Sequence, residues 1–112
     1  MKDERVYLQH MLEAAEKVLQ KTAGIKKEAF YLDENLTLAC VHLLQIIGEG
    51  ARRISPPLQA RMPTIPWKEI IGFRNKIVHD YFEVDEDVTW STIEEDLAGL
   101  VVALKEFLRH PR

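Results

Sequence analysis

Residues 74–81 read Arg-Asn-Lys-Ile-Val-His-Asp-Tyr, and this segment holds the side chains best suited to chemistry on a phosphate. Arginine offers a planar fork that binds two phosphate oxygens at once. Histidine titrates near neutral pH, so it can take up or release a proton. Arg74 and His79 together therefore meet the minimum for cleaving RNA without a metal ion. One side chain would accept the proton of the ribose 2′-hydroxyl, and the other would stabilise the charge that grows on the phosphate.

The spacing of these residues constrains the geometry of such a site. Arg74 and His79 are five residues apart, which places them roughly 140° apart around an ideal helix. Either the helix ends or distorts near His79, or a second chain completes the site. Asn75 shares a face with His79 and is predicted to support it, and Tyr81 would share the face of Arg74. Cations are also favoured at helix C-termini, so the spacing alone leaves a purely structural role open.

Length and composition predict one soluble domain that spans residues 1–112. Hydrophobic residues make up 46% of the chain and charged residues 29%, as in ordinary globular domains. The sequence has no apolar run of membrane-spanning length and no signal-peptide core. Cys40 is the single cysteine, which excludes an intrachain disulfide, and we expect it to be a buried structural thiol. We therefore expect a cytoplasmic protein, and its modest core makes a dimer plausible.

The charge is unevenly distributed. The net charge of −3 argues against a protein that coats nucleic acid without selectivity. Between Gly50 and Asp80, however, six residues are basic and only two are acidic. This basic region suits a ligand that carries phosphate, although chance clustering on a solvated face would give the same balance.

Hydrophobic periodicity predicts about four main helices and an up-and-down, all-α bundle. The first helix is expected over residues 3–22, with one apolar stripe, and Gly24 suits the left-handed cap after it. The second is expected from Lys27 or Leu32 to Arg53. Residues 55–66 contain four prolines and are predicted to form an irregular connection. The third helix starts at Trp67 and carries on into the candidate segment. The fourth is capped by Asp85 or Asp87 and extends to Leu108.

The second predicted helix is apolar on more than one face, so it is expected to be central in the bundle or part of a subunit interface. Gly48 and Gly50 are predicted to permit close approach of another backbone. His42 is predicted to lie in the core or an interface, and His10 on the surface. Glu49 either orients the site as an acid or is solvated. The histidines and acids show no metal-ligand spacing, and neither a metal nor a cofactor is expected.

Three stretches, residues 46–55, 65–82 and 84–90, resemble in order the HepT-like branch of the HEPN proteins. The Arg-x4-His spacing is unspecific, but Ile-Pro-Trp before it and Tyr-Phe after it make the resemblance specific. The resemblance implies a helical bundle that forms homodimers, with the motif Arg-x4-His-x-Tyr in a cleft at the dimer interface. It also implies a ribonuclease toxin of a type II toxin–antitoxin pair. The implied partner is the antitoxin MntA, a minimal nucleotidyltransferase that transfers AMP onto the motif tyrosine.

Carried to this chain, the resemblance makes Arg74 and His79 the catalytic pair and Tyr81 the site of AMP modification. The motif is intact. Two alternatives belong to other functional classes. The chain could be a non-catalytic dimeric interaction module that serves as the AMP acceptor of a nucleotidyltransferase. It could also be a helical bundle that binds a small nucleotide through the same basic region.

Overall fold

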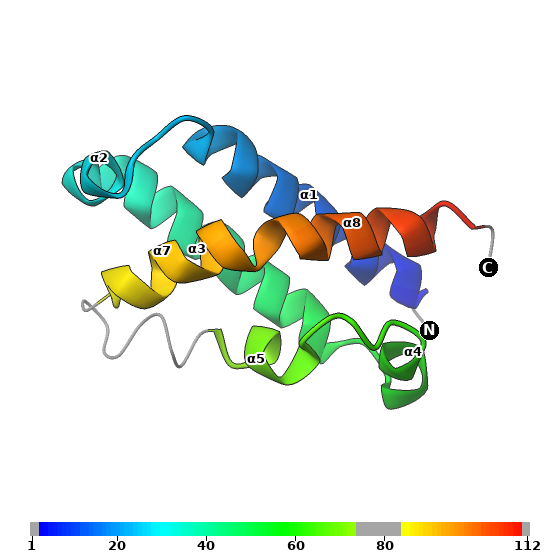
Figure 1. The fold of residues 1–112 in the computed structure, drawn as a ribbon. Helices are drawn as coiled ribbons and strands as arrows, with labels where there is room; N and C mark the ends of the chain where they lie inside the picture. The colour runs from blue at the N-terminus through cyan, green and yellow to red at the C-terminus, as the bar shows by residue number, and fades with distance from the viewer. Residues whose placement is uncertain (1–2, 74–83, 111–112) are drawn as a thin grey trace.

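The computed structural model describes residues 3–73 and 84–110, and the regular elements of these ranges are all helices (Figure 1). This agrees with the predicted all-α class. The helices are α1 (Glu4–Thr22), α2 (Lys27–Leu32), α3 (Glu34–Arg52), α4 (Pro56–Ala60), α5 (Trp67–Ile71), α7 (Glu86–Glu95) and α8 (Leu97–Leu108).

The two long helices α1 and α3 form the centre of the fold. They run in opposite directions and pack along each other, and α8 packs against α1 (Figure 1). The smaller helices α2 and α5 pack against α3, and α7 packs against α8. The core between these helices is apolar and includes the fully buried side chains of Leu8, Met11, Val18, Phe30, Cys40, Leu44, Ile47, Leu97 and Leu104.

The first predicted helix is confirmed, with one difference. The side chain of Asp3 accepts a hydrogen bond from the Arg5 N–H and caps α1. Gly24 has a φ of +75°, the left-handed conformation predicted after the helix. Val6 fits the spacing of the predicted apolar stripe, but its side chain is 43% exposed.

The second predicted helix is two helices in the structure. Asp33 adopts an extended backbone and its carboxylate accepts a hydrogen bond from the Leu36 N–H, 3.0 Å away, so a new helix begins there. The hydroxyl of Thr37 donates to the carbonyl of Phe30 at 2.7 Å and fixes α2 beside the start of α3. The two alternative starting points predicted for this helix correspond to the two ends of α2, which begins at Lys27 and ends at Leu32.

Two further predictions about element boundaries need correction. The proline-rich connection contains the five-residue helix α4, because Pro56 occupies its first turn, where a missing N–H costs nothing. The last predicted helix is interrupted at Asp96, which ends α7 and precedes α8. The predicted cap is confirmed, since the Asp85 carboxylate accepts a hydrogen bond from the Val88 N–H at 3.0 Å.

Among the helices of the described ranges, none combines the length and the apolar character needed to cross a membrane.

Candidate functional site

The candidate residues Arg74, Asn75, His79 and Tyr81 all lie outside the residues that the structure describes. Their roles stay predictions. The structure does describe what holds both ends of the segment, because Phe73 precedes Arg74 directly and Val84 follows residue 83. The helices that place these two ends are α5 and α7.

Helix α5 is anchored through Trp67. The indole is 8% exposed, and its Nε1–H donates to the carbonyls of Gln59 and Met62, each at 3.1 Å. Ile65 beside it is also buried, as are Ile70 and Phe73 further along the chain. The Ile-Pro-Trp sequence is therefore a structural device that secures the chain a few residues before the candidate segment.

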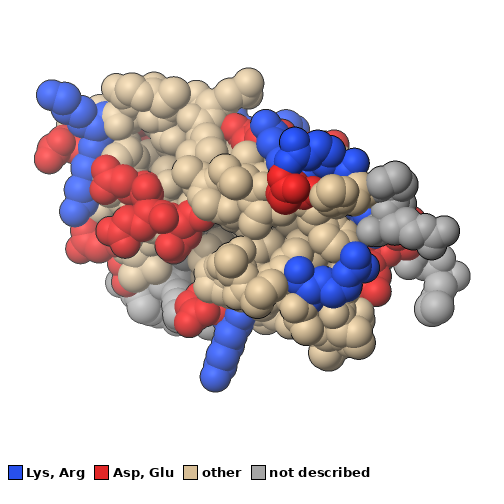
Figure 2. Space-filling model, turned by 45° about the vertical axis from the view of Figure 1, so that its right-hand side comes forward, with Lys and Arg blue, Asp and Glu red and all other residues tan. Residues whose placement is uncertain are grey.

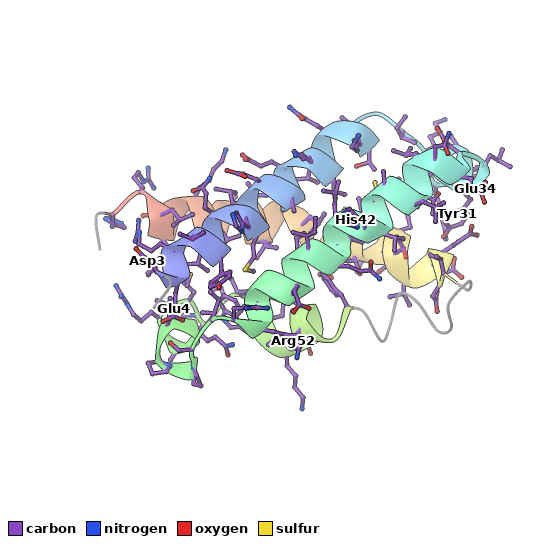
Figure 3. All side chains as sticks on the ribbon, turned by 180° about the vertical axis from the view of Figure 1, so that it is seen from behind. Asp3, Glu4, Tyr31, Glu34, His42 and Arg52 are labelled. Carbon is purple, nitrogen blue, oxygen red and sulfur yellow. The ribbon has the colours of Figure 1, made fainter. Side chains whose placement is uncertain are left out.

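The anchor of Trp67 is itself tied to α1. The Glu4 carboxylate accepts hydrogen bonds from the backbone N–H and the hydroxyl of Ser55, at 2.5 Å and 3.1 Å (Figure 3). Ser55 precedes α4, and the Gln59 carbonyl that receives the Trp67 indole lies within α4. One chain of contacts thus connects α1 to α5.

Helix α5 also lies directly against α3, at Gly48. A Cβ atom at this position would come within 2.9 Å of the Ile70 carbonyl oxygen and 3.8 Å of the Phe73 Cβ. Such a contact is too short for any side chain without movement of the backbone. The predicted role of Gly48 is therefore confirmed. Gly50 differs, since its Cβ would lie 2.7 Å from the Met11 Cγ, a side-chain atom, and 3.4 Å from the carbonyl oxygen of Tyr7. At this glycine the close neighbour is therefore the Met11 side chain rather than another backbone.

The start of α7 is held by α2. The Tyr31 hydroxyl donates to the Asp87 carboxylate at 2.9 Å, and Lys27 forms an ion pair with Asp87 at 3.4 Å (Figure 3). Burial, followed by the bond to Asp87, raises the pKa of Tyr31 above its ordinary value. The rings of Phe30 and Trp90 pack with their centroids 5.1 Å apart. Helices α5 and α7, the described helices on either side of the candidate segment in sequence, are therefore both well secured.

A hollow of about 760 Å³ lies between α3 and α5, next to the point where the chain enters the candidate segment. Its basic residues come from both elements, Arg52 from α3 and Lys68 from α5. The full lining is His42, Gln45, Ile46, Gly48, Glu49, Arg52, Lys68, Ile71 and Gly72.

Two residues that line this hollow, His42 and Glu49, had alternative predictions from the sequence. His42 is exposed, so its predicted place in the core is wrong, while a place in a subunit interface stays a prediction. Glu49 is also exposed and forms ion pairs with Arg52 at 3.4 Å and Arg53 at 3.9 Å. Glu49 is therefore solvated, and a role in orienting the site stays a prediction. His10 is exposed, as predicted.

Lys68 and Gln45 line this hollow and were not singled out from the sequence. A signal was present on α3: residues 42, 45, 49 and 52 are polar and follow the three-and-four spacing of one helical face. In a helix that is otherwise buried, this polar stripe marks the exposed side. No comparable pattern exists for Lys68, because α5 is only five residues long.

A second hollow, of about 400 Å³, lies on the other flank of α5 and is acidic. Glu69, Asp87 and Asp96 line it together with Phe73. Burial, and then the nearby carboxylates of Glu95 and Glu69, raise the pKa of Asp96. Figure 2 shows acidic side chains gathered on one side of the molecule. A phosphate chain would be repelled from this flank and attracted to the flank of Arg52 and Lys68.

Cys40 is fully buried in α3, and burial raises the pKa of its thiol to about 11. The thiol is therefore protonated at neutral pH and unsuited to act as a nucleophile. The prediction of a buried structural cysteine is confirmed. Within residues 3–73 and 84–110, no group of three or more metal-ligating side chains is placed to hold a metal ion.

Comparison with known proteins shows the family to which this chain belongs. The family model described as "Ribonuclease HepT-like" matches residues 11–110. A candidate RNase of Caldanaerobacter subterraneus subsp. tengcongensis is 38% identical over 109 residues, which cover 97% of each chain. No solved structure matches this chain.

Two archaeal relatives extend the similarity. A probable ribonuclease HepT of Thermococcus cleftensis is 37% identical, covering 84% of this chain and 86% of the relative. A candidate RNase of Methanocaldococcus jannaschii is 33% identical, covering 86% and 88%. The chain therefore belongs to the HepT-like ribonuclease family, as its sequence resemblance implied.

Proposed function

We propose that this protein is an endoribonuclease toxin that cleaves RNA without a metal ion, using Arg74 and His79. The observation that carries the proposal is the family match over residues 11–110, which includes the intact motif Arg74-x4-His79-x-Tyr81. The names of the relatives, which describe RNases, support the same reaction.

In the proposed reaction, His79 accepts the proton of a ribose 2′-hydroxyl, and the resulting oxygen attacks the adjacent phosphorus. The bond from phosphorus to the 5′ oxygen of the next nucleotide breaks, and that oxygen takes up a proton. The products are a 2′,3′-cyclic phosphate and a 5′-hydroxyl end. Arg74 binds the phosphate oxygens and stabilises the charge that develops on them. Asn75 supports His79.

We further propose that the active form is a homodimer. Arg74 and His79 would point in different directions on a single ideal helix. A cleft shared between two subunits brings a second copy of each residue to the site and removes this difficulty. The small size of the chain also favours assembly, because a core of this extent gains stability from a subunit interface.

The proposed control of the toxin is adenylylation of Tyr81 by a nucleotidyltransferase antitoxin of the MntA type. AMP on this tyrosine adds bulk and a negative phosphate two residues from His79. Such a group occupies the site for the RNA phosphate and repels the RNA backbone, as other phosphate-bearing modifications do.

The proposal is tested by incubating purified, unmodified protein with RNA in the presence of a chelator. Wild-type protein should degrade the RNA, and Arg74→Ala and His79→Ala should not. His10→Ala is the matched control, because His10 is an exposed histidine on α1. If both motif variants retain the activity, the nuclease proposal fails. If expressed protein that carries Arg74→Ala and His79→Ala still inhibits growth, the chain is a non-catalytic interaction module instead.

A further inference from the structure

Two hollows border the exposed side of α3, and together they are called the groove below. The hollow between α3 and α5 adjoins a second hollow of about 460 Å³ between α1 and α3, because His42 lines both. The second hollow is lined by Lys17, Gln20, Lys21, Ala39, His42 and Leu43. Figure 3 shows His42 near the middle of α3 and Arg52 at the C-terminal end of this helix. From residue 39 to residue 52 the groove follows α3 for roughly 20 Å.

The charge in this groove favours a polyanion. Lys17 and Lys21 lie at one end, and Arg52 and Lys68 at the other. Among the described residues that line the two hollows, Glu49 is the one acid, and it pairs with Arg52 and Arg53. This carboxylate offsets part of the positive charge of Arg52, and the four basic side chains still leave the lining with an excess of positive charge. Basic side chains spaced along a groove are what a phosphate backbone requires.

The uncharged residues of the groove suit nucleotides better than a simple polyanion. The side-chain amides of Gln45 and Gln20 can donate to and accept from base edges. Ile46 and Ile71 offer apolar surface to a base, and the His42 ring can stack on one. Bases must be unpaired to reach such groups, so the chemistry selects single-stranded RNA over a duplex.

The groove includes a residue that lies close to the candidate segment in the sequence. Gly72 lines the hollow, and Arg74 follows it two residues later. The other flank of α5 carries the acidic hollow of Glu69, Asp87 and Asp96, which repels phosphates. RNA at α5 is therefore directed to the side of Lys68 and Arg52.

We propose that this groove binds the single-stranded RNA substrate beside the bond to be cut, with Arg52 and Lys68 holding backbone phosphates and Gln45 contacting a base. The inference rests on the proposed function, since it assigns a substrate-binding surface to the same reaction. None of these residues belongs to the Arg-x4-His-x-Tyr motif.

The test measures binding of fluorescently labelled 2′-O-methyl RNA, which lacks the nucleophilic hydroxyl and stays intact. The double variant Arg52→Gln/Lys68→Gln should weaken binding by about tenfold or more, and it should reduce the dependence of affinity on salt by roughly 1.4 in the logarithmic slope. The control Lys26→Gln/Arg109→Gln removes the same charge from exposed residues outside the groove. It should change the affinity less than twofold.

Equal losses in both double variants would show a general charge effect and overturn the inference, as would unchanged binding in the groove variant. Thermal unfolding checks that each variant is folded, and Gln45→Ala, which keeps all charges, gives an independent test. Gln45→Ala should alter the preference among RNA sequences, and an unchanged preference would contradict the contact with a base.

The length of the groove gives a second test. Lys17→Gln/Lys21→Gln should weaken binding of an RNA long enough to span both hollows and leave a short RNA unaffected. A loss that is independent of RNA length would contradict a continuous groove.

Cleavage separates this inference from the proposed function. If RNA is cut in a manner that depends on His79 and the groove variant has an unchanged KM, the groove inference fails and the nuclease proposal stands. If wild-type protein cuts no RNA, the nuclease proposal fails, and the binding measurements above still decide whether the groove binds RNA.

Discussion

Gly48 of α3 lies so close to Ile70 of α5 that a Cβ atom on the glycine would come within 2.9 Å of the Ile70 carbonyl oxygen. This contact is between backbones, so a flexible side chain cannot relieve it. It fixes the position of α5 along α3. Ile70 is three residues before Phe73, which directly precedes Arg74 in the sequence. The position of α5 on α3 therefore depends on a residue with no side chain.

Gly48→Ala should displace α5 from α3. We expect a loss of about 1–3 kcal/mol in the free energy of unfolding, typical of overpacking, together with reduced RNA cleavage. Gly99→Ala is the control, because Gly99 lies in α8 with nothing within 4 Å of its Cβ position. That variant should gain roughly 0.5–1 kcal/mol from helix propensity and keep its activity. Urea unfolding and a cleavage assay measure both effects, and equal stability changes in the two variants would refute the close contact.

Trp67→Phe should loosen the anchor of α5. The substitution removes the indole N–H and leaves the carbonyls of Gln59 and Met62 without this donor. Both carbonyls still accept backbone N–H groups, those of Met62 and Ile65, so the expected loss is that of a hydrogen bond, about 0.5–1.5 kcal/mol. Trp90→Phe removes a similar volume from a partly buried ring that packs on Phe30, so it is the matched comparison. Thermal unfolding should show the larger loss for Trp67→Phe, and the opposite order would contradict the hydrogen-bonded anchor.

Asp96→Asn should stabilise the protein at neutral pH. Burial and the carboxylates of Glu95 and Glu69 raise the pKa of Asp96, so the folded state disfavours its charge. The folded protein then binds this proton more tightly than the unfolded chain, and the penalty is present above the raised pKa. As the pH falls toward the ordinary value of 3.8, the advantage of the variant should shrink.

Unfolding midpoints across this pH range test the sign of the effect. Asparagine removes no helix cap here, because the Asp96 side chain forms no capping hydrogen bond with α8. Glu13→Gln, an exposed carboxylate on α1, should show no such pH-dependent gain. An advantage of Asp96→Asn that grows on acidification would contradict the account.

Tyr81→Phe should retain RNA cleavage but escape neutralisation by the antitoxin. Intact-mass measurement after co-expression with an MntA-type nucleotidyltransferase should show AMP on wild-type protein and none on this variant. Tyr31→Phe, which removes a hydroxyl bonded to Asp87, should be modified like the wild type. AMP found on Tyr81→Phe would place the modification at another residue.

The sequence predicted those features that single residues determine. The left-handed Gly24, the close backbone approach at Gly48 and the Asp85 cap each follow from one residue type with one physical property. The interruptions of the helices at Asp33 and Asp96 were not predicted, because apolar periodicity continues through both positions. At Asp33 a side-chain cap starts a new helix, whereas at Asp96 the backbone changes direction without such a cap.

The residues of the candidate site also separate into those that the sequence predicts and those that it does not. Arg52 and Lys68 are distant from each other in sequence, and only the packing of α5 on α3 brings them to one hollow. Periodicity within one helix carries no information about that contact. The motif residues themselves rest on the intact sequence pattern and on the family match.

The most direct test of the central proposal compares an RNA oligonucleotide with the DNA of the same sequence, in the presence of a chelator. The products are analysed by mass spectrometry. If His79 activates a ribose 2′-hydroxyl beside Arg74, wild-type protein should cut only the RNA, leaving fragments that end in a 2′,3′-cyclic phosphate. Cleavage of both strands, fragments that end in a free 3′-hydroxyl, or undiminished cleavage by His79→Ala would contradict it.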